Sequence, residues 1–269
     1  MTIAIEQLIK MHDPRCMSIE SLNVGRGQGI LSKDQIVGSF ASAQHQHAVG
    51  FDLLMAKYRH DVQAEQRIRD AIAIWARNKS SRPLSVQACQ LALLMVLERN
   101  LPAQIEDVAK LLRRYSAKAG QTRKNTDGLR AEIKQLERLR CRDRVTDDEY
   151  QRVGEQIEGL AARIEAERSA LRTWSQQHAM HSNVCPRCNG TGKTLRPSIA
   201  ICNECGDRGR ITATFEHLRK SLAITGAVMP AGEWPQYLGL VKQCMQWLYI
   251  EESATSQMLG KQIHNEIEA

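Results

Sequence analysis

The chain contains no apolar run long enough to cross a bilayer. The longest, Leu91 to Leu97, falls far short of the ~20 residues that a transmembrane helix needs. The first residues lack the basic segment and long apolar core of a secretory signal peptide. Aromatic residues are also scarce, at 4% of 269 residues, although the hydrophobic content of 42% is ordinary. We therefore expect a soluble, cytoplasmic protein with room for one large core or two small ones.

The sequence also lacks the patterns of a catalytic site. The segment Gly25-Arg-Gly27-Gln-Gly29 is followed by no Lys-Ser/Thr pair, which argues against a phosphate-binding loop. No nucleophile stands at a spacing from a base that indicates covalent catalysis. We expect residues 1–31 to form a flexible N-terminal segment, and the chain to be a binding protein and not an enzyme.

Two Cys-x-x-Cys pairs, Cys185/Cys188 and Cys202/Cys205, are separated by thirteen residues. Each pair offers two sulfurs from one tight turn, and two such turns complete a tetrahedral zinc site. Glycines that permit tight turns accompany both pairs, namely Gly190, Gly192, Gly206 and Gly209. Because all four positions are cysteine, the pattern predicts one structural Zn2+ with no open position for catalysis.

Other ligands and pairings are less well supported. His178 and His181 precede the first pair and could compete as ligands, but four cysteines already fill a tetrahedral set. The remaining cysteines are scattered along the chain, which argues against a disulfide framework. They are Cys16, Cys89, Cys141 and Cys244.

The pattern of apolar and capping residues in the rest of the chain predicts a mainly α-helical protein. Ser32-Lys-Asp-Gln35 has the form of a capping box, and apolar residues recur at helical spacing from Ile36 to Leu54. Further helices are predicted at 64–77, at 84–98, at 105–115, from Thr212 or Thr214 to Ile224, and at 237–259, the last with Leu238, Val241, Met245, Leu248 and Tyr249 in the core. The helices at 84–98 and 105–115 resemble a helix-turn-helix, although that pattern is common in any all-α protein.

The composition changes after these helices and predicts an antiparallel helical hairpin at 118–182. Residues 118–128 are polar and are expected to form a loop. Heptad-like apolar stripes follow from Leu129 to Leu139 and from Val153 to Leu171, and Thr146-Asp-Asp-Glu149 is a second capping box. Arms of about 20–25 residues would extend ~30–37 Å. The hairpin is either a solvated spacer or an arm that reaches a second partner.

These patterns divide the chain into five segments. They are the flexible N-terminal segment (1–31), an N-terminal helical part of the body (32–117), the hairpin insertion (118–182), a zinc-binding unit (183–212) and a C-terminal helical part of the body (213–269). The predicted fold is a mainly α, helical DNA-binding domain with an embedded four-cysteine zinc-knuckle unit and an inserted coiled-coil hairpin.

Positive charge is concentrated around the cysteines. The chain has a formal net charge of +7, and from Cys185 to Lys220 seven Lys/Arg stand against three Asp/Glu. Arg187 and Arg208 lie within or beside the knuckles and could serve only to stabilise the negative charge of four thiolates on zinc. Basic side chains here can also contact the phosphates or bases of DNA. The DNA-binding candidates are Lys193, Arg196, Arg208, Arg210, Arg219 and Lys220.

Several segments, in their order along the chain, resemble a known family. They are Gln35-Ile-Val-Gly-Ser-Phe-Ala-Ser-Ala-Gln44, Gly50-Phe51, the unit Cys185–Lys193, the second knuckle Cys202–Gly209 and Glu251-Glu-Ser-Ala254. Their combination is similar to the late-gene antitermination protein Q of lambda-like bacteriophages. The resemblance covers residues 31–100 and 180–269. The section 105–180 departs from the shorter members of that family, as an insertion would.

The resemblance implies a function in transcription. Proteins of that family bind a double-stranded DNA element at the phage late promoter and engage paused host RNA polymerase while sigma factor is still attached. They then travel with the polymerase, which reads through pauses and terminators, and the elongation factor NusA is a further implied partner. The zinc unit lies among DNA-binding helices in that family, so the resemblance makes Thr214–Leu222 the candidate base-reading helix. The implied location is the bacterial host cytoplasm.

Two other functions fit parts of the same pattern. A zinc-containing, sequence-specific DNA-binding repressor or activator would need the same DNA-binding apparatus, and the sequence does not separate it from an antiterminator. Cys185–Gly192 also resembles one repeat of the cysteine-rich module of DnaJ-type chaperones. That module needs four repeats and two zinc sites, whereas this chain has two repeats, so the chaperone is the weaker alternative.

Overall fold

The computed structural model describes residues 33–142, 146–195, 199–226, 229–230 and 232–268. The predicted flexible N-terminal segment, the capping residue Ser32 and the DNA-binding candidate Arg196 lie outside these residues. The described chain is mainly helical, as the sequence predicted, and it also contains a small two-stranded sheet. It divides into two compact units. The first combines the described parts of Met1–Arg99 and Leu218–Ala269, and the second is Asn100–His217.

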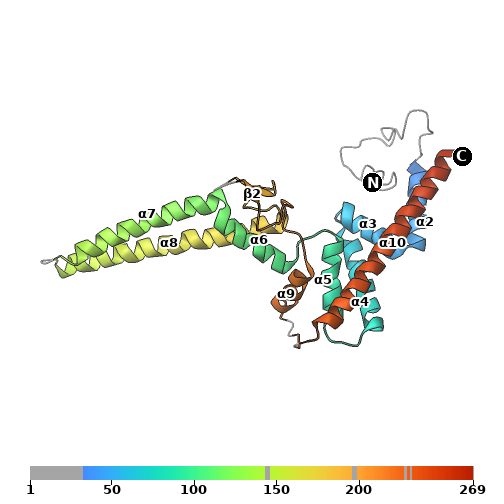
Figure 1. Ribbon diagram of the computed structural model, residues 1–269, viewed down its shortest axis with the longest axis horizontal. Coiled ribbons are helices and arrows are strands. Elements are labelled where there is room, and N and C mark those ends of the chain that lie inside the picture. Colours follow the sequence, from blue (N-terminus) through green and yellow to red (C-terminus); the bar gives the residue numbers. More distant parts are fainter. Residues whose placement is uncertain (1–32, 143–145, 196–198, 227–228, 231, 269) are drawn as a thin grey trace. The chain divides into compact units, whose positions relative to one another are not determined.

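The first unit is built from helices of both chain ends. They are α2 (Lys33–Gln46), α3 (Ala48–Tyr58), α4 (Val62–Lys79), α5 (Ser85–Val96) and the long α10 (Trp234–Glu268) (Figure 1). The helical pattern from Ile36 to Leu54 is thus divided between two helices that meet at His47. Helix α9 (Phe215–Ile224) begins in the second unit and continues into the first.

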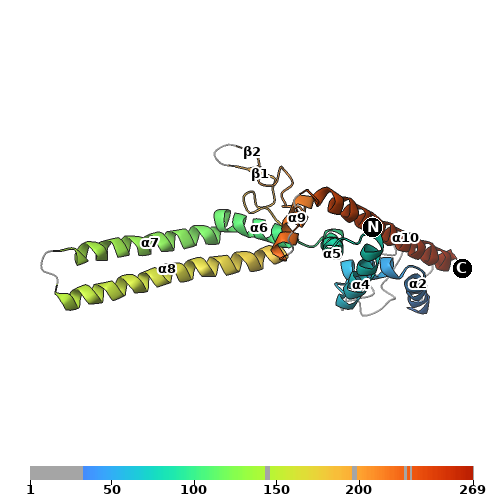
Figure 2. The same ribbon diagram turned by 90° about the horizontal axis from the view of Figure 1, so that it is seen from below.

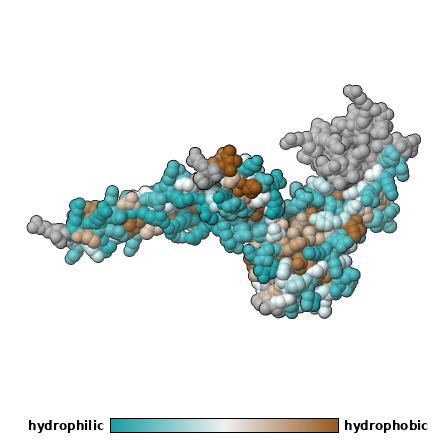
Figure 3. All heavy atoms as spheres, viewed as in Figure 1, coloured by the Kyte–Doolittle hydropathy of each residue, from teal (hydrophilic) through white to brown (hydrophobic). Residues whose placement is uncertain are grey.

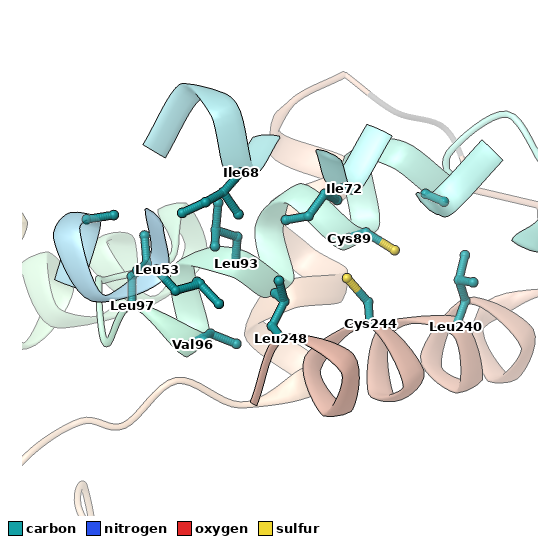
Figure 4. Packing of buried hydrophobic residues seen from close by; sticks show 12 residues of the cluster. Leu53, Ile68, Ile72, Cys89, Leu93, Val96, Leu97, Leu240, Cys244 and Leu248 are labelled. Atoms are coloured by element: carbon teal, nitrogen blue, oxygen red, sulfur yellow. The ribbon is translucent and has the colours of Figure 1, made fainter. Parts of the chain in front are cut away.

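The core of the first unit joins α3, α4 and α5 to α10. Its fully buried residues include Leu53, Ile68, Ile72, Cys89, Leu93, Val96, Cys244 and Leu248 (Figure 4). Trp75 of α4 stacks on Trp247 of α10 with ring centroids 5.4 Å apart. The prediction that Tyr249 belongs to this core is wrong, because its side chain is 46% exposed. Tyr249 lies about 100° around the helix from Leu248, outside the buried stripe.

Gly50 lets α3 approach α10 closely. A Cβ at this position would overlap the side chain of Thr255 and the backbone carbonyl of Glu251. Lys57, about two turns further along α3, forms an ion pair with Glu252 at 3.1 Å. These contacts join residues about 200 positions apart in the sequence and fix the two helices against each other.

The second unit contains α6 (Pro102–Tyr115), α7 (Ala117–Arg140), α8 (Asp147–His181) and the strands β1 (Lys193–Thr194) and β2 (Ala200–Ile201). Helices α7 and α8 lie side by side as an antiparallel hairpin in both ribbon views (Figures 1 and 2). The short strands pair antiparallel, with Lys193 opposite Ile201. The helices at 84–98 and 105–115, which resemble a helix-turn-helix, correspond to α5 and α6 and belong to different units.

The predicted loop at 118–128 is wrong, because α7 already begins at Ala117. The Ser116 side chain caps this helix by accepting from the Ala119 N–H at 3.1 Å. Thr122 and Thr126, which share a helix face with Ala119, are buried. The inward face of this segment thus consists of small and hydroxyl-bearing residues. It lacks the large apolar side chains at helical spacing by which a helix is recognised in a sequence.

The second capping box is confirmed at the start of α8. The Thr146 hydroxyl accepts from the Glu149 N–H, and the Glu149 carboxylate accepts from the Thr146 N–H, both at 3.3 Å. Helix α8 has 35 residues, so this arm is longer than predicted because it continues to the metal-binding segment. Within the described part of the chain, no helix combines the length and apolar character needed to span a bilayer.

Candidate metal centre

The four predicted cysteines come together in the second unit. The sulfurs of Cys185, Cys188, Cys202 and Cys205 all lie within 4.8 Å of one another, and all four residues are buried. The Cys185–Cys202 and Cys188–Cys205 sulfur distances are 3.8 and 3.7 Å. A tetrahedral ion with metal–sulfur bonds of about 2.3 Å requires sulfur–sulfur distances of about 3.8 Å. The cluster can therefore hold one metal ion.

The two knuckles are related by an approximate twofold symmetry. A shift of seventeen residues carries Cys185 onto Cys202 and Cys188 onto Cys205. The Cys185 N–H donates to the Gly209 carbonyl at 2.9 Å, and the equivalent Cys202 N–H donates to the Gly192 carbonyl at 2.8 Å. Each knuckle therefore holds the start of the other, so the two sulfur pairs are positioned together.

The backbone after each second cysteine follows the same path. The residues at the first, second and fourth positions have positive φ in both knuckles, namely Asn189, Gly190 and Gly192, then Gly206, Asp207 and Gly209. A Cβ at Gly192 would overlap the Asp207 carbonyl, and a Cβ at Gly209 would overlap the Gly190 carbonyl. Glycine is thus needed at Gly192 and Gly209 for close backbone contact as well as for the turn.

Helices α6 and α8 support the metal unit. The cysteines share one buried cluster with Val108, Ala109 and Leu112 of α6, Ala179 of α8, and Ile211. Gln104 of α6, itself buried, donates from Nε2 to the Ile211 carbonyl at 2.7 Å. The Ile211 N–H donates to the Asn183 carbonyl at 2.8 Å, which joins the two ends of the metal-binding segment. The metal centre is therefore fixed to the base of the α7–α8 hairpin.

The thiols differ in how readily they ionise. Burial raises the pKa of Cys185 and of Cys205 above the ordinary value. At Cys188 burial acts in the same direction, but the Gly192 N–H and the neighbouring Cys205 outweigh it and lower the pKa of that thiol to about 7. The backbone amides of the first knuckle are thus arranged to stabilise a thiolate, the form in which cysteine binds a metal.

The predicted histidine alternatives are not part of this cluster. Among the described residues, the only close group of possible metal ligands consists of the four cysteines. His178 instead stacks on Trp174 with ring centroids 5.3 Å apart. The thiolate set is complete without it, so the ion would have a structural role.

The DNA-binding candidates do not form one group in the structure. Lys193 on β1, Arg208 and Arg210 are exposed and belong to the second unit. Arg219 and Lys220 are exposed on the part of α9 that belongs to the first unit. Three of the six candidates, Lys193, Arg208 and Arg210, thus lie in the same unit as the four cysteines. Arg196 lies outside the described residues.

A groove of about 340 Å³ runs beside the second knuckle. Basic residues Lys110, Arg208 and Arg210 line it together with the acids Asp107 and Glu204. Arg208 donates to the Thr212 hydroxyl at 2.8 Å. Of the two predicted starts of this helix, Thr212 and Thr214, the structure has Thr214 as the cap of α9: its hydroxyl accepts from the His217 N–H at 3.2 Å, and the Thr214 N–H donates back to the His217 ring at 3.1 Å.

Sequence reasoning missed a second polar cluster on the metal unit. The Tyr115 hydroxyl, at the end of α6, donates to Glu204 at 2.9 Å, and Arg187 lies 3.4 Å from the same carboxylate. The guanidinium groups of Arg114 and Arg187 lie over the Tyr115 ring at 5.1 and 5.6 Å. Arg187 therefore links the two knuckles to α6. No signal in the sequence joins Tyr115 to cysteines some 70 positions away.

The described chain is mainly helical, and four buried cysteines that are close enough to hold a metal ion lie at the base of a helical hairpin. The chain belongs to the family described as conserved hypothetical protein CHP02642, whose profile matches residues 2–268. That description states no activity. Neither curated proteins nor solved structures gave a match to this chain.

Proposed function

We propose that this protein is a zinc-containing transcription antitermination factor. In this proposal it binds a double-stranded DNA element at a phage late promoter and loads onto paused host RNA polymerase that still carries sigma factor. The polymerase then reads through pauses and terminators, with NusA as a further partner, in the bacterial host cytoplasm. The bound ion is one structural Zn2+ on Cys185, Cys188, Cys202 and Cys205.

The observation that carries this proposal is a contact in the fold between two of the segments on which the resemblance rests. Gly50 of the early segment contacts Glu251, the first residue of the late Glu-Glu-Ser-Ala segment. Lys57, just after the early segment, pairs with Glu252 of the late one at 3.1 Å. Both segments lie where α3 packs against α10 in the core of the first unit, so the residues of the resemblance form part of one interface. Their contact supports a shared fold with the antitermination family.

The choice of zinc rests on the chemistry of the ligands. Four thiolates with sulfur–sulfur distances near 3.8 Å suit a tetrahedral ion that prefers sulfur. A closed tetrahedral set leaves no position for water or substrate, so the proposed role is to hold the unit that presents Lys193, Arg208 and Arg210. These exposed cations are the proposed phosphate or base contacts.

The proposed function is tested in two steps with purified full-length protein. First, DNA fragments that bind the protein are selected from a random library. Second, the selected element is placed at a promoter that has a sigma-dependent pause just downstream, ahead of a terminator, and transcribed by bacterial RNA polymerase holoenzyme, with and without NusA. We expect the fraction of transcripts that pass the terminator to rise only when the element and the protein are both present. A template with a scrambled element is the control.

The two steps separate the alternatives. Element-specific binding without read-through would replace the antiterminator by a DNA-binding repressor or activator. Failure to select any element, by protein that retains its zinc, would remove both DNA-binding functions.

A further inference from the structure

The hairpin of α7 and α8 buries little of its own apolar surface. Leu160 and Ile164 of α8 are buried, each 7% exposed. Leu129 and Leu136 of α7 are only half-buried, and Leu139 is 38% exposed. Apolar residues therefore appear between the hydrophilic ones along the hairpin surface (Figure 3). Two helices alone cover only one stripe of each other, so the hairpin leaves apolar surface for another helical partner.

The two arms carry opposite charge. Helix α7 has seven Lys/Arg against three Asp/Glu, a formal net charge of +4. Helix α8 has seven Asp/Glu against four Arg, a formal net charge of −3 with neutral histidines. Opposite charges on neighbouring helices commonly decide which helices pair and in which orientation.

The hairpin itself makes little use of this complementarity. Ion pairs in the arms join residues of the same helix: Arg130 to Asp127 at 2.9 Å in α7, and Arg168 and Arg172 to Glu165 at 3.4 Å in α8. Between the described parts of α7 and α8, no ion pair joins one helix to the other. The opposite charges of the arms are thus available to a further pair of helices.

A groove of about 630 Å³ follows one flank of the hairpin. Leu129 and Gly128 of α7 and Ala166 and Ala170 of α8 form its apolar part. Glu132 of α7 and Arg163 of α8 also line it, both exposed, and neither has an ion pair with another described residue. One flank thus carries an acid from the basic arm and a base from the acidic arm.

We propose that the hairpin flank is a dimer interface whose occupant is a second copy of this chain. In a twofold arrangement α7 lies against α8 of the second copy, and α8 lies against α7 of the second copy, which gives a four-helix bundle. The basic arm then meets the acidic arm twice. Glu132 pairs with Arg163 of the second copy, and Arg163 pairs with Glu132 of the second copy.

The flank is large enough for such an interface. Helix α7 has 24 residues, and a helix of that length extends about 36 Å. Two helices side by side are about 20 Å wide. A face of these dimensions approaches the ~800 Å² per partner that stable protein interfaces bury.

Charge reversal distinguishes this proposal from a passive hairpin. The mass of the full chain in solution is measured by sedimentation equilibrium with zinc present, and we expect twice the chain mass of 30.3 kDa. Glu132→Arg and Arg163→Glu should each weaken association by about tenfold or more, because two symmetry-related pairs become repulsive. Ala161→Arg, on the other flank of α8, adds a charge away from the groove and should leave the dimer intact.

A mixture of the two single variants gives the decisive result. Each variant alone repels its own copy, whereas a heterodimer of Glu132→Arg with Arg163→Glu restores both opposite-charge pairs. We therefore expect equimolar mixing to restore association, and the Glu132→Arg/Arg163→Glu double variant to form a homodimer. An effect of the substitutions on folding alone would not be rescued by mixing. Circular dichroism checks that each variant remains helical.

Three outcomes would overturn the proposal. The parental chain could be a monomer at tens of micromolar, the mixture could fail to associate, or Ala161→Arg could weaken the dimer as much as the groove variants. A monomer whose charge-reversal variants lose terminator read-through would instead assign the flank to polymerase. The dimer does not depend on the proposed transcription function, since the mass measurement needs neither DNA nor polymerase.

Discussion

The side chain of Gln104 connects the first turn of α6 to the metal unit. Its Nε2 donates to the Ile211 carbonyl at 2.7 Å, and its Oε1 accepts from the Leu101 N–H at 3.1 Å. Gln104 is only 2% exposed, so water cannot replace either hydrogen bond. One amide group therefore satisfies a free N–H at the start of a helix and a carbonyl at the edge of the knuckles.

Replacing Gln104 by leucine should destabilise the second unit. Gln104→Leu keeps a side chain of similar size but leaves the Leu101 N–H and the Ile211 carbonyl without partners. Buried groups left unsatisfied cost about 1–3 kcal/mol each, so we expect a loss of about 2–6 kcal/mol. Urea unfolding of the zinc-loaded protein measures this loss. Gln176→Leu, at an exposed position of α8, is the matched control and should change stability little.

Loss of one cysteine ligand should remove the metal and unfold the metal unit. We expect one zinc per parental chain, and Cys202→Ser should lower the zinc content several-fold because serine is a poor ligand for zinc. Structural zinc contributes apparent free energies of about 10–16 kcal/mol in small units, so chelation should also reduce helicity at α6 and the hairpin base. Elemental analysis and circular dichroism provide the measurements.

The exposed cysteine of the hairpin provides the control for that experiment. Cys141 lies at the end of α7 and is not part of the cluster, so Cys141→Ser should keep one zinc per chain. Two zincs in the parental protein, or equal zinc content in both variants, would contradict the four-cysteine site.

The two knuckle glycines Gly192 and Gly206 should respond differently to alanine. Both have positive φ, 74° and 59°, but only Gly192 lies against backbone, at the Asp207 carbonyl. Gly192→Ala must therefore move one knuckle relative to the other, and we expect it to weaken zinc binding at least tenfold. Gly206→Ala meets open space and should cost only about 1 kcal/mol from its backbone conformation. A competition titration with a chromogenic chelator measures both affinities.

Metal ligands and caps were predictable because short-range rules determine them. The Cys-x-x-Cys spacing, the Thr146–Glu149 capping box and a helix cap at Thr212 or Thr214 each depend on residues within a few positions of one another. The helical segment at 118–128 was not predictable in this way, because Thr122 and Thr126 are buried although they are polar. The contacts of Gln104 and Tyr115 with the metal unit depend on packing between distant segments, which no local pattern encodes.

For the basic residues of the site, the sequence predicted which residues are involved but not which groups surround them. Their clustering between Cys185 and Lys220 indicated a basic region, and the structure places Lys193, Arg208 and Arg210 beside the metal centre. The neighbouring acids Asp107 and Glu204 come from α6 and from within the second knuckle. Only the folded structure shows that they share a groove with Arg208 and Arg210, and that α6 contributes the base Lys110 as well as the acid Asp107 to that groove.

Arg210 provides the clearest test of DNA binding by the metal unit. Arg208 also holds Thr212 at 2.8 Å, so its removal would disturb the loop before α9 as well as any DNA contact. Arg210 is exposed, and its backbone pairs with Val184 in an isolated β-bridge that an alanine can also form, so Arg210→Ala should leave the fold intact. On the selected DNA element, we expect weaker binding and a salt dependence reduced by about one unit for one lost phosphate contact.

The salt dependence decides what kind of contact Arg210 makes. If it reads a base, the salt slope should stay nearly constant while discrimination at one base pair falls by about 1–3 kcal/mol. Arg77→Ala, on the exposed side of α4 and remote in sequence from the knuckles, removes the same charge and serves as the control. Fluorescence anisotropy at several salt concentrations measures both variants. Equal slopes and affinities for Arg210→Ala, Arg77→Ala and the parental protein would show that Arg210 makes no energetically important contact with DNA, and would remove this part of the proposed DNA surface.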